Sequence, residues 1–577
     1  MSTPWSPVGA PALPSVGALS RVKERLTAAH VVLWACFAIV GTAVVVPTGT
    51  LVWQSFTKST PAGTVLALDS FARVLGKGAT YQLLLNTVTF SAAMTVVAGA
   101  LGFLFAWIAA RTNAPGRRLM PIAILLPYLV PPTLGAITWI LLLSPSNGII
   151  NMWLKALVGG APFNIYSFAG MVFVESLYTF PLSFMFFFAA LSSLNPTLEE
   201  ASAVSGAGPL RTLWRTTVPS MWPTVLSVAT LLFIIGLESF DVAWFLGYPA
   251  KIYLLSIEVF LLTRYKYPPD LGSAAVFGVI AFLAAVAMIA AYRRVTRQRE
   301  RFATITGKGY RPGDLDIRWM RWPASIVFYL LVTVIGVLPV LLLLAISVDA
   351  VSWPFRITSR PSLENFRWIL TDSESLRAIG NTAFLAIGGA FTVVILGFFV
   401  GYIGVRTQIR GRGVLDYLAF VPFAFPSTVL AVGIIGALIT TPLYNTIWIM
   451  LLAFSIKFLP YGLRNLSNNM LQIHPELEEA SYAAGAGLMR TLWRVVLPLT
   501  VPGIVAAWSL LLIVFMRQFS LPIMLSSPGS QVVTIMLFQE FEAGQMGHVA
   551  AFGMLLVGSC IPFIVVARYL GRASQSI

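Results

Sequence analysis

Long apolar runs separated by short polar segments dominate this chain. A helix needs about 20 mostly apolar residues to cross the hydrocarbon core of a bilayer, and twelve runs approach or meet that length. They cover approximately 30–53, 82–109, 119–143, 168–190, 220–245, 271–292, 323–348, 380–405, 414–439, 445–463, 499–520 and 548–570. The tenth run is short, and the eleventh contains Arg517. The pattern predicts an all-α polytopic membrane protein with twelve transmembrane helices.

The composition excludes the water-soluble classes of protein. Of the 577 residues, 57% are hydrophobic and 10% are charged, whereas a soluble domain carries about 25% charged residues. The formal net charge is +16, and Lys and Arg collect on the cytoplasmic side of membrane proteins. With the N-terminus inside, cytoplasmic segments hold 25 Lys and Arg and periplasmic segments hold 11. We therefore expect both termini to be cytoplasmic, and we expect no nucleic-acid partner.

The remaining polar and reactive residues suggest no chemistry. Residues 1–28 are polar and rich in Pro and Ser, which predicts a cytoplasmic tail rather than a signal peptide. Cys36 and Cys560 lie in apolar runs, and the three histidines have no ligand-like neighbours, so we expect neither a disulfide nor a metal site. Segment 294–322 is a basic cytoplasmic linker that would suit an anionic lipid. No Walker-type glycine loop occurs, so the chain does not hydrolyse ATP by that route.

An internal repeat is the most informative feature of the sequence. Segments 195–219 and 474–498 match at 15 of 25 positions without a gap, at an offset of 279. Farther upstream the offset becomes 295, and it joins Arg111-Thr112 to Arg406-Thr407, Pro127 to Pro422, and Pro131 to Pro426. Each half therefore has six spans in the same order and orientation, 29–293 in the first half and 323–577 in the second. The arrangement is a parallel duplication about an axis along the membrane normal.

The two best-matched segments, 195–219 and 474–498, are here called the matched loops, and both are expected on the cytoplasmic side. Asn195 is a good N-cap, and Pro196 suits the first helical position. Gly206 and Gly485 provide a turn before a second short helix. A helix–turn–helix at the membrane surface follows from this pattern. One copy alone could be an amphipathic linker, but two copies favour a docking surface for a partner with two equivalent sites.

At these residues the sequence resembles the permease subunits of bacterial type I ABC importers. Their hallmark is a cytoplasmic Glu-Ala-Ala loop followed by a glycine and a Leu-Pro. It stands here as Glu200-Ala201-Ser202 with Gly206 and Val218-Pro219, and as Glu479-Ala480-Ser481 with Gly485 and Leu497-Pro498. Ser replaces the second Ala in both copies. The resemblance covers nearly the whole chain and extends to fused double permeases of the ferric-iron, thiamine and phosphonate type.

The resemblance implies a fold, a set of partners and a transport mechanism. Spans two to six of each half form the translocation core, and the first span packs peripherally. Two copies of a cytoplasmic ABC ATPase grip the matched loops and use the ATP, while this chain binds no cofactor, lies among the lipids of the inner membrane and is no enzyme. A periplasmic binding protein delivers the substrate. Overall length, the fusion and the stretch 127–132 favour iron(III), with phosphonate, thiamine, a polyamine or a sugar phosphate left open.

Within the matched loops the resemblance assigns roles to individual residues. Glu200 and Glu479 are expected to orient the first helix of each loop and to meet basic groups on the ATPase. The arginines are expected to face the ATPase or lipid phosphate, or to be ordinary residues of the cytoplasmic side. The candidate coupling residues are Glu200, Ala201, Gly206, Arg211, Arg215, Glu479, Ala480, Gly485, Arg490 and Arg494.

Ionisable residues within membrane spans are functional candidates, because burying one unpaired is costly. The candidates for the translocation pathway are Glu175, Glu238, Asp241, Lys457 and Arg517. The repeat aligns Glu238 with Arg517, so the first half contributes carboxylates and the second contributes cations. They would line a cavity for substrate, or they would form a salt-bridge network that holds the halves together, such as Glu175 with Lys457 and Glu238 with Arg517. Prolines in the third and ninth spans would kink them and free backbone carbonyls.

Two other classes of protein fit the sequence less well. A secondary transporter of the major-facilitator type is also duplicated as six plus six spans. Its acidic and basic loop after the second and eighth spans is missing, because 110–118 and 405–413 contain no Asp or Glu. It also leaves the matched loops unexplained. No nucleophile–base pair or metal cluster supports a membrane enzyme.

Overall fold

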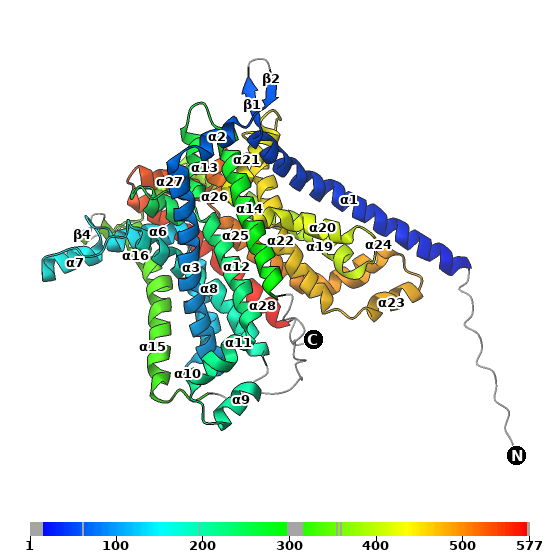
Figure 1. The fold of residues 1–577 in the computed structure, drawn as a ribbon, viewed down its shortest axis with the longest axis horizontal. Helices are drawn as coiled ribbons and strands as arrows, with labels where there is room; N and C mark the ends of the chain where they lie inside the picture. The colour runs from blue at the N-terminus through cyan, green and yellow to red at the C-terminus, as the bar shows by residue number, and fades with distance from the viewer. Residues whose placement is uncertain are drawn as a thin grey trace.

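The computed structural model describes residues 16–60, 63–194, 197–296, 315–352, 356–357 and 361–573. Most of the predicted linker and the first residues of the predicted tail lie outside these ranges. The described chain is helical apart from two short hairpins, β1 (Thr57–Thr60) with β2 (Gly63–Leu66) and β3 (Val351–Ser352) with β4 (Arg356–Ile357). Figure 1 shows two groups of helices that diverge from a common region.

Twelve spans are present when each bent pair of helices counts as one span; nine are single helical stretches and three are bent pairs, among the described residues. The first half contains α1 (Val16–Ser55), α2 (Asp69–Leu75), α3 (Gly78–Arg111), η1 (Arg117–Leu119), α4 (Met120–Ala123), α5 (Leu125–Leu129), α6 (Pro132–Leu143), α7 (Ile149–Val158), α8 (Phe168–Ser193), α9 (Thr197–Val204), α10 (Pro209–Thr212), η2 (Leu213–Thr217), α11 (Val218–Ser220), α12 (Trp222–Glu238), η3 (Ala243–Gly247), α13 (Leu255–Phe260), η4 (Leu261–Tyr265) and α14 (Leu271–Thr296).

The second half repeats this order without a counterpart of α7. It contains η6 (Arg318–Met320), α15 (Arg321–Val332), η7 (Thr333–Val337), α16 (Leu338–Ser347), α17 (Glu364–Thr371), α18 (Ser373–Phe384), η8 (Leu385–Gly389), α19 (Ala390–Arg406), α20 (Arg412–Phe420), η9 (Val421–Ala424), α21 (Ser427–Leu438), α22 (Ile447–Leu471), α23 (Glu476–Ala483), α24 (Leu488–Thr491), η10 (Leu492–Val496), α25 (Leu497–Met516), α26 (Ser520–Leu525), α27 (Val533–Glu542) and α28 (Met546–Ala573).

Three predicted spans are broken rather than straight. The third bends by 82° between α5 and α6, and the ninth bends by 111° between η9 and α21. The residues before Pro131 and Pro426 are extended, because proline disfavours helical geometry in the residue that precedes it. The fifth span was predicted as 220–245, but its transmembrane helix covers only Trp222–Glu238 after a bend of 75°. The helical breaks therefore occur inside predicted spans.

The first span of each half packs against helices of the other half. Helix α1 packs against α20 and α21, and Thr50 Oγ1 donates a hydrogen bond to Gly433 O at 2.8 Å. In the second half, Tyr329 on α15 donates to Gly116 O at 2.8 Å, and α16 packs against α6. The first span of each half, which was predicted to pack peripherally, therefore crosses over to the other half and connects the two halves.

A close approach between the second and fourth spans recurs in both halves. A Cβ on Gly102 of α3 would lie 1.9 Å from Ser183 Oγ of α8. At the equivalent place, a Cβ on Gly397 of α19 would lie 3.0 Å from the backbone of Gly462 on α22. Small residues allow helices to approach closely in a membrane, where packing replaces the hydrophobic effect between helices. This contact holds α8 and α22, the helices that lead into the matched loops, against α3 and α19 of the same half.

Candidate functional site

Both matched loops form the predicted helix–turn–helix. Helix α9 turns into α10 at Gly206, whose φ is +80°, and α23 turns into α24 at Gly485, whose φ is +86°. That left-handed conformation favours glycine. The serine that replaces the second Ala of the family motif bridges the two short helices. The Ser202–Thr212 hydroxyl distance is 3.0 Å, and the corresponding Ser481–Thr491 distance is 2.9 Å.

Each loop is joined to the second span of its half by a buried ion pair. In the first half, Arg111 Nε lies 3.3 Å from Glu199 Oε2, and both side chains are almost completely buried. Thr217 also donates a hydrogen bond to Glu199 at 2.6 Å. Arg111 ends α3 and Glu199 lies on α9. The ion pair therefore fixes the first helix of the loop to the end of the second span.

The second half repeats this contact with different supporting groups. Arg406 Nε lies 3.1 Å from Glu478 Oε1, and Tyr402 donates to the same carboxylate at 3.0 Å. Arg406 also donates to the carbonyls of Met470 and Ile473, at 2.7 and 2.5 Å. The pairs correspond under the internal repeat, although the supporting hydroxyl comes from a different element in each half.

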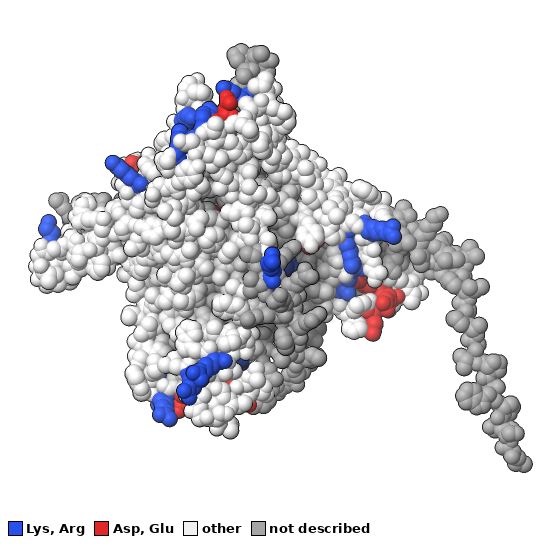
Figure 2. Space-filling view, in the orientation of Figure 1, with Lys and Arg blue, Asp and Glu red and all other residues white. Residues whose placement is uncertain are grey.

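The candidate coupling residues lie mainly on the outer surface of the loops. Exposed members are Ala201, Gly206, Arg211, Arg215, Glu479, Ala480, Gly485, Arg490 and Arg494, and Glu200 is half-buried. Trp214 and Trp493 are also exposed, at 68% and 59%. Figure 1 places α9 and α23 at separate corners of the molecule, and Figure 2 shows acidic side chains gathered over α23. Asn195 and Pro196 lie outside the described residues.

Sequence reasoning missed the role of four buried residues at the loops. It placed the orienting carboxylates at Glu200 and Glu479, whereas the carboxylates that fasten the loops in the structure are Glu199 and Glu478. Their partners, Arg111 and Arg406, were recognised only as markers of the repeat. The useful signal was present in the sequence, because an arginine that recurs at the same end of two equivalent spans indicates that both arginines have the same kind of partner.

The intramembrane charges form a different network from the two example pairs. Lys457 Nζ pairs with Glu238 Oε2 at 2.9 Å, across the boundary between the halves. Lys457 also donates to Phe425 O at 2.7 Å. The Glu238 carboxylate accepts hydrogen bonds from the hydroxyl and the backbone N–H of Ser427. The pairing of Glu175 with Lys457 is therefore wrong, because Glu238 occupies that position.

The remaining three charged groups also have partners. Arg517 donates to Tyr128 O and lies over the Tyr128 ring, 4.7 Å from its centroid, so its pairing with Glu238 is also wrong. Asp241 accepts a hydrogen bond from Thr133. The Glu175 carboxylate accepts one from Ser239 at 2.6 Å. Each of the five predicted pathway residues therefore makes at least one polar contact.

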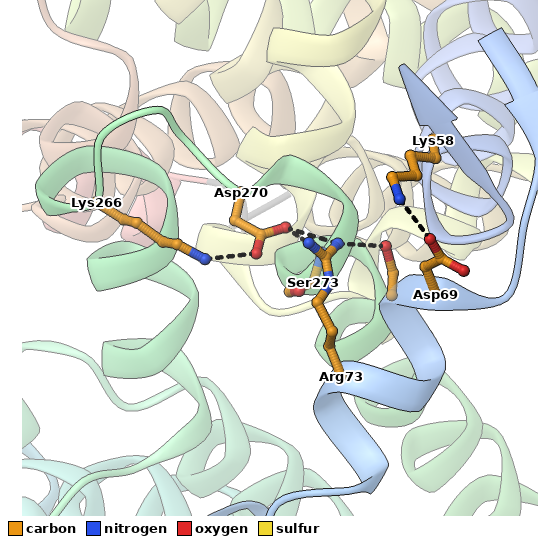
Figure 3. Close-up of polar contacts among 7 residues, drawn as sticks. Lys58, Asp69, Arg73, Lys266, Asp270 and Ser273 are labelled. Atoms are coloured by element: carbon orange, nitrogen blue, oxygen red, sulfur yellow. Dashed lines mark hydrogen bonds and ion pairs between the residues drawn. The ribbon is translucent and has the colours of Figure 1, made fainter. Parts of the chain in front are cut away.

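A second group of charges lies at the end of the molecule away from the matched loops, which we call the far side. Figure 3 shows Lys266 and Arg73 converging on Asp270, at 2.7 and 3.4 Å, and Lys58 on Asp69 at 2.7 Å. Burial raises the pKa of Asp270, but hydrogen bonds from Lys266 and Ser273 outweigh it and hold the pKa below its usual range. Figure 2 shows basic side chains here and at α10, with mostly uncharged side chains between.

Comparison with known families gives two matches within this chain. A family model described as the binding-protein-dependent transport system inner membrane component matches residues 98–301 and 393–575. The two matches begin 295 residues apart, which equals the upstream offset of the repeat. Both matches leave out the first span of their half, the span that crosses to the other half.

Curated relatives match over different shares of the chain. A ferric transport system permease protein of Actinobacillus pleuropneumoniae is 24% identical over 506 residues, which is 86% of this chain and 72% of the relative. An Fe(3+)-transport system permease protein of Haemophilus influenzae is 22% identical over 85% of this chain and 90% of its own length. An sn-glycerol-3-phosphate transport system permease protein of Salmonella typhi is 31% identical over 31% of this chain and 62% of its own length.

Two solved structures of alginate ABC transporters align with part of this chain. A bacterial ABC transporter involved in import of the acidic polysaccharide alginate aligns with a TM-score of 0.39 and 18% identity, over 49% of this chain and 100% of that chain. The alginate transporter in complex with an alginate pentasaccharide-bound periplasmic protein aligns with a TM-score of 0.36 and 19% identity, over 41% of this chain and 84% of that chain.

Proposed function

Because the chain belongs to the family of binding-protein-dependent transport system inner membrane components, we propose that it forms the translocation pathway of an ATP-driven iron(III) importer. The chain itself is a non-catalytic, multi-pass transport subunit of the inner membrane. The observation that carries the iron(III) proposal is the similarity to ferric permeases over most of both chains. The glycerol-3-phosphate permeases match over a segment of 185 residues.

Two copies of a cytoplasmic ATPase would bind the matched loops. The exposed surface of each loop offers two arginines and a tryptophan at equivalent positions, a combination typical of protein interfaces. Behind that surface, the Arg111–Glu199 and Arg406–Glu478 pairs link the loops to the second and eighth spans. Closure of the ATPase pair would draw the loops together, and the ion pairs would carry this movement into the spans. A periplasmic binding protein would deliver the substrate on the far side.

The stoichiometry is tested by purification from the native membrane. The tagged chain, expressed from its own locus, is isolated in mild detergent and its companions are quantified by mass spectrometry. We expect two ATPase copies per chain and a binding protein. Replacing Trp214 and Trp493 with Ala should lower ATPase recovery, whereas replacing Trp153 on α7, which is exposed but remote from the loops, should not. Unchanged recovery with the loop variants would contradict the docking assignment.

The substrate is tested separately by uptake. Cells lacking the chain should take up radioactive iron(III) more slowly than cells complemented with it, and the recovered binding protein should bind iron(III). If uptake is unchanged and that protein binds a phosphonate, thiamine, a polyamine or a sugar phosphate instead, the iron(III) proposal is wrong while the transport mechanism stands.

A further inference from the structure

Two phenylalanines that correspond under the internal repeat touch each other. Phe240 and Phe519 are separated by 279 residues, the offset of the repeat, and their ring centroids lie 5.6 Å apart. Equivalent residues of a two-fold arrangement contact one another only where they meet the symmetry axis. In a parallel duplication this axis runs along the membrane normal between the halves. The pair therefore lies where a central pathway through the molecule must pass.

Both rings are fixed within an aromatic cluster contributed by the two halves. Each is 1% exposed. Phe240 packs against Phe260 at 5.3 Å, and Phe519 packs against Phe538 at 5.6 Å. The cluster lies toward the far side, next to the break that follows α12 in the first half and α25 in the second. Tightly packed apolar rings on the axis leave no room for hydrated solute, and such constrictions close channels by excluding water.

The charges beside the rings hold the broken spans in place. Lys457 binds Phe425 O, and Arg517 binds Tyr128 O, each at the carbonyl end of the first piece of a broken span. Glu238 binds the first turn of α21 at Ser427, and Asp241 binds the first turn of α6 at Thr133. The cations thus lie at the carboxyl-terminal ends of helices and the carboxylates at the amino-terminal ends, which complements the helix dipoles. These contacts also provide hydrogen-bond partners for polar groups at the breaks, which lipid cannot do.

Three of these contacts cross between the halves: Glu238 to Lys457, Glu238 to Ser427, and Arg517 to Tyr128. The matched loops, by contrast, lie at separate corners in Figure 1. The halves therefore meet around the aromatic pair and diverge toward the loops. We propose that Phe240 and Phe519 form the closed far-side gate of the pathway, and that Glu238, Lys457 and Arg517 are positioning residues that hold the gate shut.

The gate is tested first by a leak. The Phe240→Ala/Phe519→Ala chain, reconstituted alone into phosphatidylethanolamine–phosphatidylglycerol vesicles, should dissipate a potassium diffusion potential at least about tenfold faster than wild type. The matched control is Phe105→Ala/Phe328→Ala, whose buried rings also meet across the halves, 5.2 Å apart, but are not related by the repeat and do not pack against Phe240 or Phe519. Size-exclusion profiles confirm that both variants fold. Equal leaks in the two variants, or none in either, would overturn the gate.

The position of the pair on the axis is tested by cross-linking. Cys36 and Cys560, the only cysteines of the sequence, are first replaced by Ala. Phe240 and Phe519 are then replaced by Cys, and a protease site is inserted between residues 297 and 314. After reaction with a short bis-methanethiosulfonate cross-linker, which bridges two thiols through reducible disulfides, and after cleavage, the halves should stay joined on a non-reducing gel and separate on reduction. Trp214→Cys/Trp493→Cys, another repeat-related pair, should not join them. Halves that separate without reductant in the Phe240/Phe519 variant would refute the arrangement.

Discussion

At the scale of single residues, a buried ion pair lies where each matched loop meets the second span of its half. The Arg406 side chain is 9% exposed and the Glu478 side chain 7%. Removing one partner of such a pair leaves an uncompensated buried charge, which costs much more than the net stability that the pair supplies. Because Arg406 ends the second span of its half and Glu478 lies on the loop, the pair fixes the loop relative to that span.

Arg406→Met should destabilise the protein by about 3–5 kcal/mol, because the Glu478 carboxylate loses its ionic partner inside the protein. The measurement is the free energy of unfolding in detergent, together with recovery of the ATPase. Arg406→Met/Glu478→Gln should regain part of the loss. Arg494→Met serves as the control, since Arg494 is exposed on the same loop. A single variant as stable as wild type would show that the ion pair does not fasten the loop.

The identity of the charged residues could be predicted from the sequence, but not their partners. All five pathway candidates make polar contacts, yet neither of the two example salt bridges was correct. Pairing depends on where a span breaks, and a backbone carbonyl at a break competes with side-chain carboxylates for a cation. Lys457 binds one of each, Glu238 and Phe425 O. A prediction that pairs charged side chains with one another does not consider such backbone carbonyls as partners.

At the scale of elements, proline and glycine determine where the helices end or turn. The prolines of the third and ninth spans predicted kinks, and the helices break at Pro131 and Pro426. The turn in each matched loop was also predictable from its glycines. The bend of 75° before α12 has no counterpart in the second half, where Leu488–Met516 forms one continuous span. Nothing in the structure explains that difference.

Gly206→Ala should cost about 1–2 kcal/mol through backbone strain alone, because its φ is +80° and no atom lies within 4 Å of the added methyl group. Gly208→Ala provides a matched control two residues away. Gly208 has a φ of −70° and equally open surroundings. We expect thermal unfolding and ATPase recovery to change in the first variant and to stay near wild type in the second. Equal effects of the two substitutions would mean that the turn geometry is not what matters.

At the scale of the whole molecule, the distribution of Lys and Arg predicts the orientation of both ends. Alkaline phosphatase, which is active only in the periplasm, should be inactive when fused after residue 577 and active when inserted after Gly159. Green fluorescent protein, which matures in the cytoplasm, should give the opposite result at each site. Gly159 follows α7 in the segment after the third span and has open space around it. Phosphatase activity at the C-terminal fusion would reverse the predicted topology.

The crossover of α1 has a consequence for synthesis. Helix α1 ends at Ser55, but α21, a helix of the second half against which it packs, begins at Ser427. At a translation rate of about 5–20 residues per second, α1 waits in the bilayer for roughly 20–75 s before the part of its packing surface that comes from the second half has been made. During that interval its tightly packed face is open to lipid, to chaperones and to membrane proteases. The fusion of the two halves shortens this wait to the time of a single round of translation, since the missing surface follows on the same nascent chain.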